Sequence, residues 1–165
     1  MSEPAQALDK PGVLAPPPLI AFVTLVAGLV LDRLVPIGAV GAIVPRSWRL
    51  VVAAALFLLS GWIVFRAIRA FRTVGTNFDV RKPALALATG DIYVRTRNPM
   101  YQALGILLLA LAVGAASDWT VLLLVPWLLV MHVGVVRREE RYLTARFGDD
   151  YRRYQAQVPR YGWPF

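Results

Sequence analysis

The chain has 165 residues, of which 58% are hydrophobic and 17% are charged, and its mean hydropathy is +0.56. Soluble domains usually carry about 25% charged residues, and the apolar residues here form long blocks, which excludes an ordinary soluble domain. The net charge is +8, but the basic residues lie at the edges of these blocks, where they mark membrane topology and contact anionic headgroups. We therefore expect membrane lipids as partners, and no nucleic acid.

Four apolar blocks, at about 19–35, 48–71, 100–116 and 119–136, approach the roughly 20 helical residues that a bilayer core requires, and the last is expected to belong to a helix of about 119–146. The predicted fold class is therefore all-α: a polytopic membrane protein of about four transmembrane helices. We expect the last helix to continue beyond the bilayer and residues 147–165 to form an interfacial helical cap on the cytosolic side. Neither a repeat nor a low-complexity linker divides the chain, so residues 1–165 are expected to form a single domain.

The segments between the blocks predict the topology. Glycines and prolines break the apolar stretch 36–47, which indicates a loop or a shallow re-entrant segment rather than a fifth span. Residues 114–118 allow only a tight turn, so the last two helices are expected to form an antiparallel hairpin. With four spans, the N-terminus, the 72–98 loop and the C-terminal tail share one side, which holds 15 of the 18 basic residues. The positive-inside rule predicts that this side is cytosolic, with both termini and the active site.

Several kinds of chemistry are excluded by composition. The chain has no cysteine and one histidine, His132, so neither thiol chemistry nor a histidine-cluster metal site is possible, and we expect no metal. Residues 1–18 contain five prolines and no basic N-terminal region, so no secretory signal is expected.

The start of the third block is the first candidate site. Asn98 and Pro99 are typical of a helix start, because Asn can cap and Pro fits the first turn. In one interpretation they do only this, and the nearby tyrosines anchor the helix at the membrane interface. In the other, free N–H groups at the helix start and the rings of Tyr93 and Tyr101 bind a ligand, since such rings suit a stacked purine or a sulfonium cation.

The last helix carries the second candidate. His132, Glu139 and Arg146 are seven residues apart, so a continuous helix would place them on one stripe that descends from the bilayer. Polar residues at membrane depth are costly and often functional, but His132 could equally bond a neighbouring helix, and residues 137–141 could be a solvated ion-pair face. Glu140 and Arg146 would meet over one ligand if the helix bends before Gly148 or if the ligand spans that face.

Taken together, these motifs resemble a known family. They comprise Leu87 to Gly90 with Tyr93, Arg97-Asn98-Pro99-Met100-Tyr101, Glu139-Glu140, residues 147–154 (FGDDYRRY) and Val158-Pro159-Arg160. Their order and spacing resemble those of the membrane-embedded methyltransferases that include isoprenylcysteine carboxyl methyltransferase and the phospholipid N-methyltransferases. The likeness covers about residues 83–161. Asn98 stands where the family commonly has histidine, and Gly90 is three residues before Tyr93 rather than two.

The resemblance implies S-adenosyl-L-methionine as cofactor, bound at the cytosolic ends of the last two helices under the C-terminal cap. It places Leu87, Asn98, Pro99, Met100 and Tyr101 around the nucleoside and amino-acid parts, with Glu139 on cofactor hydroxyls or ammonium. Tyr93 and His132 complete the candidate cofactor-binding residues. A Rossmann-type site is excluded, because no Gly-x-Gly-x-x-Gly follows a strand.

Catalysis is then assigned to Glu140 and Arg146, nearest a lipophilic acceptor that arrives from the bilayer: a small molecule, a prenylated substrate or a lipid. A carboxylate acceptor, as on an isoprenylcysteine, would be oriented by Arg146. An amine acceptor, as on a lipid, would need Glu140 or His132 as a base. Thiol and phenol acceptors also fit.

Two other functions stay open at this point. The chain could be a non-catalytic membrane module whose basic tail binds anionic lipid or a protein partner. It could also be a reductase, since some sterol reductases share the distant C-terminal pattern, although the chain is short for their additional helices.

Overall fold

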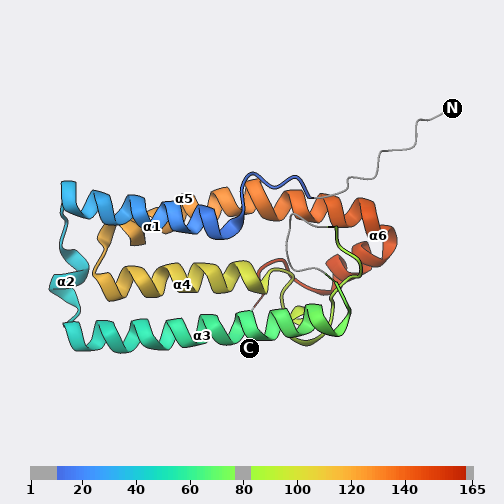
Figure 1. Ribbon diagram of the computed structural model, residues 1–165, viewed down its shortest axis with the longest axis horizontal. Coiled ribbons are helices and arrows are strands. Elements are labelled where there is room, and N and C mark those ends of the chain that lie inside the picture. The colour runs from blue at the N-terminus through green and yellow to red at the C-terminus, as the bar shows by residue number, and fades with distance from the viewer. Residues whose placement is uncertain (1–10, 77–82, 163–165) are drawn as a thin grey trace.

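The computed structural model describes residues 11–76 and 83–162, which form a bundle of long helices closed at one end by a folded C-terminal segment (Figure 1). The end of the predicted cap, residues 163–165, lies outside the described residues, as do 1–10 and 77–82. In chain order the elements are α1 (Pro17–Leu34), α2 (Ala39–Ile43), α3 (Arg46–Thr73), the 3-10 turn η1 (Asp91–Val94), α4 (Pro99–Ala115), α5 (Asp118–Met131), the π-helical segment η2 (His132–Val136) and α6 (Arg137–Gln157). No strand occurs in the described part of the chain, which confirms the predicted all-α fold.

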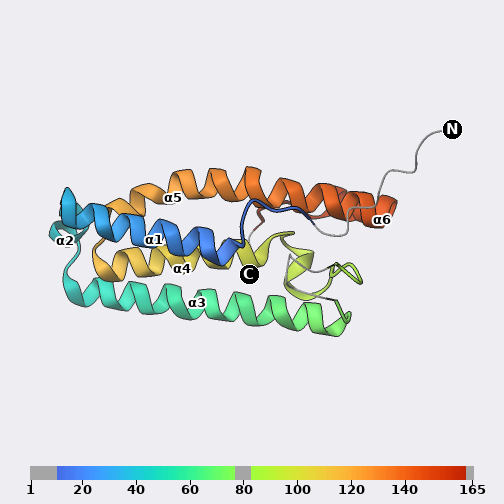
Figure 2. The ribbon, with the colours of Figure 1, turned by 45° about the horizontal axis from the view of Figure 1, so that its top comes forward.

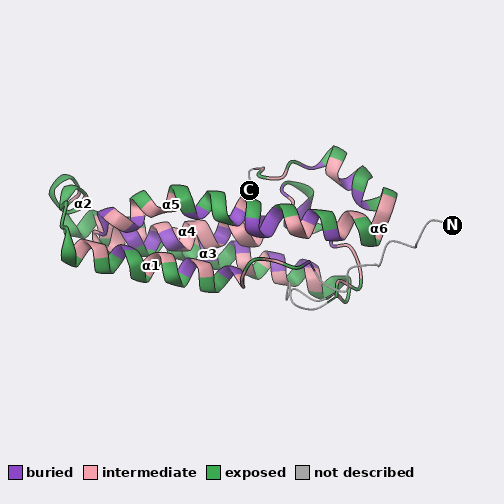
Figure 3. Cartoon of the chain, turned by 90° about the horizontal axis from the view of Figure 1, so that it is seen from above, coloured by how far each residue is buried: buried purple, intermediate pink, exposed green. Residues whose placement is uncertain are grey.

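The long helices present an apolar outer surface of the kind that lipid covers. Three of them are long and apolar enough to cross a membrane: α1, α3 and the continuous helix that runs from α5 through η2 into α6. Phe22, Leu58, Phe65 and Val125 are each more than half exposed, while buried residues lie mainly along the inner faces (Figure 3). α4 is shorter, with 17 residues or about 25 Å. The protein is therefore a polytopic membrane protein.

α4 lies at the centre of the bundle. It packs most extensively on α3 and also contacts α1 and α5, which pair with each other (Figures 1 and 2). Small buried residues on α4, including Ala103, Ala110 and Ala112, allow this close approach. Gly105 likewise has no side chain, so the ring of Trp127 can lie directly against α4 at this position. The polar residues at the two ends of α4 are consequently held in fixed positions.

Hydrogen bonds close the end of the bundle where α2 lies. The backbone N–H of Trp119 donates to the Asp32 carboxylate at 3.2 Å, and its indole Nε1 donates to the Val35 carbonyl at 2.7 Å. The Asp118 carboxylate accepts from the backbone N–H of Val40 at 2.9 Å. Residues 36–47 thus form a loop with one short helix and no fifth span, and α4 and α5 form the predicted hairpin, since α4 ends at Ala115.

At the other end, η2 changes the register of the last helix. A π-helical turn holds about one residue more than an α-helical turn and disturbs the regular backbone bonding. The Gly134 carbonyl accepts from the Leu14 backbone N–H at 2.9 Å, and the Arg138 guanidinium donates to the Gly12 carbonyl at 2.9 Å. These two bonds hold residues 11–16, here called the N-terminal strap, against the junction of α5 and α6.

α6 folds back on itself at Gly148. That residue has φ 55° and ψ −125°, a backbone conformation that residues with a side chain rarely adopt. The bend divides α6 into an outgoing limb, 137–147, and a return limb, 149–157, at the end of the molecule away from α2 (Figure 1). The predicted cap is therefore mainly the return limb of a bent helix, and it leads residues 158–162 back toward the start of α4.

Candidate functional site

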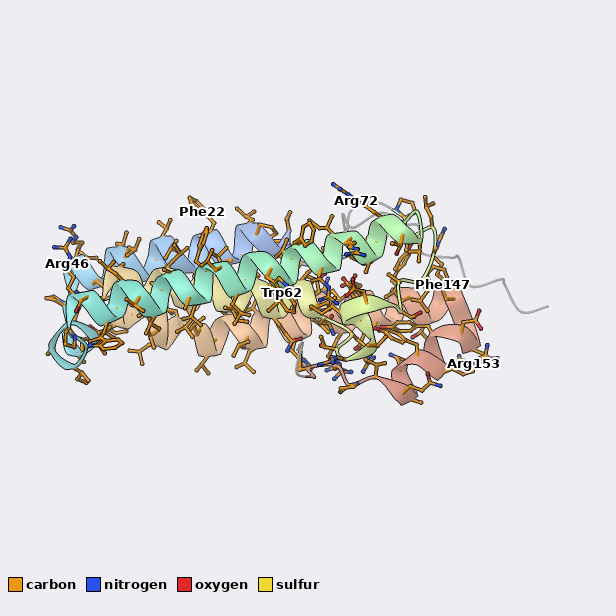
Figure 4. The ribbon with its side chains drawn as sticks, turned by 90° about the horizontal axis from the view of Figure 1, so that it is seen from below. Phe22, Arg46, Trp62, Arg72, Phe147 and Arg153 are labelled. Carbon is orange, nitrogen blue, oxygen red and sulfur yellow. The ribbon has the colours of Figure 1, made fainter. Side chains whose placement is uncertain are left out.

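A cavity of about 840 Å³ lies at the end of the bundle where α6 folds back. Figure 4 shows that Arg72 and Phe147 mark this end and that Arg46 marks the opposite one. The wall combines residues from the N-terminal strap, the start of α1, α3, the loop before α4, α4 and α6. The lining residues include Pro16, Pro17, Pro18, Ser60, Val64, Phe71, Arg72, Leu87, Tyr93, Arg97, Asn98, Met100, Tyr101, Leu104, Leu107, Glu139, Glu140, Tyr142, Tyr151 and Tyr154. The cavity is thus apolar toward the bundle and polar toward α6, and its volume is within the range of about 300–1,000 Å³ that is usual for small-molecule sites.

Glu139 is the acidic group of this cavity that lacks a basic partner. Its carboxylate accepts a hydrogen bond of 2.7 Å from the Tyr101 hydroxyl and pairs with no basic side chain among the described residues. Burial raises the pKa of the Glu139 carboxyl above its usual range, and the neighbouring charge of Glu140 adds to this rise, while the Tyr101 hydrogen bond opposes it. A cation in the cavity would favour the charged carboxylate, so this arrangement suits a positively charged ligand.

Glu140, by contrast, interacts with two arginines. Its side chain is buried, and both carboxylate oxygens accept from Arg160, Oε1 from Nε at 2.9 Å and Oε2 from Nη2 at 2.7 Å. Arg97 Nη1 lies 2.9 Å from Glu140 Oε1 and is also buried. This three-residue cluster joins α6, the loop before α4 and the C-terminal tail, and Arg97 brings a guanidinium to the cavity wall.

The C-terminal tail, residues 158–162, holds the start of α4 in place. Asn98 Nδ2 donates to the Arg160 carbonyl at 3.1 Å, and the Arg97 backbone N–H donates to the Pro159 carbonyl at 3.0 Å. Asn98 is the N-cap residue of α4 and Pro99 is its first residue, which confirms the predicted helix start, but the Asn98 side chain makes no capping bond, because its amide bonds to the tail instead. Gly162 lies so close to the Arg95 carbonyl that a Cβ would be 1.9 Å from its oxygen.

Aromatic rings form the rest of the polar wall. Tyr93 is buried on η1, edge-on to Phe71 with ring centroids 5.3 Å apart, and its carbonyl accepts from the Tyr154 hydroxyl at 2.7 Å. Burial raises the pKa of the Tyr93 hydroxyl well above its usual value, and the charge of Glu139 raises it further. The ring is therefore neutral at physiological pH, and it supplies an apolar face to a ligand.

The structure brings together most, but not all, of the residues selected from the sequence. The following line the cavity: Leu87, Tyr93, Asn98, Met100, Tyr101, Glu139 and Glu140. Pro99 is buried at the start of α4 and is not part of the wall.

His132 and Arg146 lie outside this cavity. His132 Nδ1 is 2.9 Å from the Tyr161 hydroxyl, and Arg146 is exposed, with its guanidinium 6.0 Å from the centroid of the Phe147 ring. The expectation of one continuous stripe through His132, Glu139 and Arg146 fails at His132, because η2 rotates the helix between His132 and Glu139; Glu139 and Arg146 both lie in α6 before its bend, but Arg146 is exposed. The bend at Gly148 comes after Arg146, so it does not carry Arg146 toward Glu140.

Sequence reasoning missed several wall residues. Arg97 lines the wall and was part of the quoted motifs but was not selected; Arg160, which lies outside the wall and bonds to Glu140, was not selected either, although a buried glutamate needs positive partners. Pro16 to Pro18 were taken as the boundary of the first helix, and α3 carried no signature. Their part in the cavity depends on how the strap and α3 pack, which no local pattern encodes.

Comparisons with known proteins agree with the geometry. The family model described as phospholipid methyltransferase matches residues 48–150, which run from α3 past the bend of α6 and make up more than half of the chain. An uncharacterized protein of Haemophilus influenzae is 37% identical to the chain over 62 residues, which are 38% of this chain and 98% of that protein. No solved structure matches the chain.

Proposed function

Because the chain belongs to the phospholipid methyltransferase family, and is thus a membrane methyltransferase, we propose that it transfers a methyl group from S-adenosylmethionine to a lipophilic acceptor reached from the bilayer. The observation that carries this proposal is the Glu139 carboxylate. It faces a cavity large enough for such a ligand and has only a tyrosine hydroxyl as its partner among the described residues.

The residues of the cavity fit this cofactor. S-adenosylmethionine carries a sulfonium, an ammonium, ribose hydroxyls and a flat purine, and when bound it supplies an electrophilic methyl group. Glu139 would accept from the ammonium or the hydroxyls, and the rings of Tyr93 and Tyr101 would lie against the purine or the sulfonium. Leu87 and Met100 add apolar contacts, and Asn98 lines the same wall. Pro99 and His132 are left out of the proposed site.

The apolar side of the cavity suits the hydrocarbon part of the acceptor. Ser60 and Val64 of α3 and Leu104 and Leu107 of α4 line it, and all four lie within the long helices of the bundle. An acceptor that moved sideways from the lipid would therefore keep its chain among apolar residues while its polar end reached Arg97. Burial within this cavity would also exclude water from the reacting groups.

Arg97 takes the place in the proposal that the sequence suggested for Arg146. Glu140, hydrogen-bonded to Arg160 and ion-paired with Arg97, would act as the positioning residue that holds the Arg97 guanidinium at the wall. A guanidinium can orient a carboxylate acceptor through two parallel hydrogen bonds. An amine acceptor would instead bond through its lone pair to the methyl carbon while the carbon–sulfur bond breaks and a neutral thioether leaves. Its proton would pass to a base, for which Glu139 is the carboxylate without a basic partner among the described residues.

The basic residues from which the cytosolic side is predicted lie at the same end of the molecule as the cavity. The N-terminal strap, the loop before α4 and α6 all lie there, opposite α2 (Figure 2). We propose accordingly that the cavity opens toward the cytosol and that both termini are on that side.

Binding of the cofactor tests the proposal. Titration calorimetry of the full chain in a non-ionic detergent should show saturable binding of S-adenosylmethionine. Glu139→Gln should weaken it by about 10- to 100-fold, since a hydrogen bond to a charged group is worth about 1.5–3 kcal/mol. Arg146→Gln, a charge change outside the cavity, is the matched control and should bind like the wild type.

Two results would count against this assignment. If the wild-type chain shows no binding heat, the non-catalytic alternative stands. If Glu139→Gln and Arg146→Gln bind equally well, the cofactor occupies some other place.

A further inference from the structure

A second cavity, of about 390 Å³, lies on α6 and opens to the outside. Four arginines line it: Arg137 and Arg141 from the outgoing limb, Arg152 from the return limb and Arg160 from the tail. The bend at Gly148 is what brings these groups together, because 11 positions separate the arginines at 141 and 152 in the sequence. We call this cavity the arginine pocket. Its surface exists only because α6 folds back on itself.

Charges in the arginine pocket do not cancel. Its one acidic lining residue, Glu140, already neutralises Arg160 and Arg97. Arg137 and Arg141 form no ion pair or hydrogen bond with any described residue, which leaves two guanidinium groups available at one opening. Such a pair attracts an anion with several acceptor oxygens, because each guanidinium offers parallel donors.

The position of the arginine pocket along the membrane normal favours a lipid as the source of that anion. Arg137 follows directly on the apolar segment that ends at Val136, so the arginine pocket begins where the hydrocarbon ends and the headgroups lie. The return limb adds the amide of Gln155 on the opposite side, together with Arg152, whose guanidinium already donates to the Asp149 carboxylate at 2.7 Å. At this level of a bilayer the abundant anion with tetrahedral oxygens is the phosphate of a phospholipid.

We propose that the arginine pocket binds the phosphate group of an anionic phospholipid. This site is distinct from the methyl-transfer cavity, although Glu140 lines both. It predicts specific, saturable retention of one lipid, which differs from general attraction of a basic surface to a membrane. Its test requires neither cofactor nor methyl transfer, so it can fail or succeed independently of the proposed function.

The test is lipid binding by the full chain, measured by native mass spectrometry from non-ionic detergent. Phosphatidylglycerol should bind with a stoichiometry of one and should bind more tightly than zwitterionic phosphatidylcholine. The double variant Arg137→Gln/Arg141→Gln should lower the affinity for phosphatidylglycerol about tenfold or more. The control Arg146→Gln/Arg153→Gln removes the same charge from α6 at two exposed positions outside the pocket, and should change the affinity less than twofold.

If both double variants lose affinity for phosphatidylglycerol equally, only net charge matters and the proposal is overturned. Unchanged affinity in the pocket variant would also overturn it. A parallel titration with inorganic phosphate and glycerol phosphate identifies the source of the anion. Weak binding of both, with tight binding of the lipid, supports a membrane ligand. Soluble phosphates that bind as tightly as the lipid, and lose affinity in the pocket variant, would overturn the lipid as ligand.

Discussion

Two neighbouring glutamates in α6 have opposite environments. Glu140 is surrounded by guanidinium groups, whereas Glu139 meets one tyrosine hydroxyl and an apolar cavity. Adjacent residues on a helix point about 100° apart, so one carboxylate can serve the framework while the other faces a ligand. The Glu-Glu pair recognised in the sequence is therefore two residues with separate tasks.

In the proposed function, the raised pKa of Glu139 would make cofactor binding depend on pH. A cation binds the ionised carboxylate, so affinity for S-adenosylmethionine should fall as the pH is lowered through the pKa of the free protein, which burial holds above the usual range of a carboxyl. Calorimetric titrations between about pH 5 and pH 8 measure this. In Glu139→Gln the dependence should vanish, and a variant that kept the full wild-type dependence would assign it to another group.

The raised pKa of Glu139 affects folding stability in the opposite direction to ligand binding: it favours the folded state at low pH. Because the folded state binds the Glu139 proton more tightly than the unfolded chain does, this carboxyl favours folding at low pH, and its contribution declines as pH rises from the unfolded toward the folded pKa. A group that weakens the protein near neutral pH is typical of a site that serves a ligand.

At the scale of elements, helix positions followed from the sequence but helix irregularities did not. The apolar blocks predicted α1, α3, α4 and α5 closely, because bilayer thickness sets the length of a span. The register change at η2 and the bend at Gly148 were not predicted. At η2 the Gly134 carbonyl accepts a tertiary bond from Leu14, which a helical pattern does not encode, and the bend occurs where Gly148 adopts a positive φ.

These two irregularities also explain which site residues were found. Tyr101 and Glu139 were identified because their motifs lie near the ends of two helices that the cavity joins. His132 and Arg146 were included because a regular helix would align them with Glu139; η2 removes His132 from that alignment, and Arg146 lies outside the cavity wall. Arg97 gained its role from the bonds that the tail and α6 supply.

Close contact of α1 with α5 depends on Gly28. A Cβ at this position would lie 2.1 Å from Thr120 Oγ1 and 2.7 Å from Thr120 Cα, so one of the helices would have to move. Gly28→Ala should therefore destabilise the protein by about 1–3 kcal/mol, the usual cost of overpacking, and lower the midpoint of thermal unfolding in detergent.

Gly61 supplies the matched control for that measurement. It lies in the middle of α3, where a Cβ would meet nothing within 4 Å, so Gly61→Ala should leave the midpoint unchanged or slightly higher because alanine favours helix. If Gly28→Ala is as stable as Gly61→Ala, then α1 and α5 do not approach as closely as described.

For the whole molecule, the arrangement joins an apolar part and a polar part in one cavity. Residues of the bundle line the part that suits a hydrocarbon chain, and the charged groups come from α6, the loop before α4 and the end of α3. The family match spans both parts, from α3 into the return limb of α6. This continuity is the reason to expect chemistry on a lipophilic molecule rather than on a water-soluble one.

Transfer of the methyl group itself is the most direct test of this account. Purified protein in phospholipid vesicles, supplied with host-membrane lipid extract and prenylated peptides, would be incubated with S-adenosylmethionine labelled in the methyl group, and label in lipid and peptide would be counted. We predict label in an apolar product for the wild type and for Arg146→Gln, with at least a tenfold loss for Glu139→Gln. Wild-type protein that binds the cofactor yet labels no apolar product, or Glu139→Gln protein as active as wild type, would contradict the account.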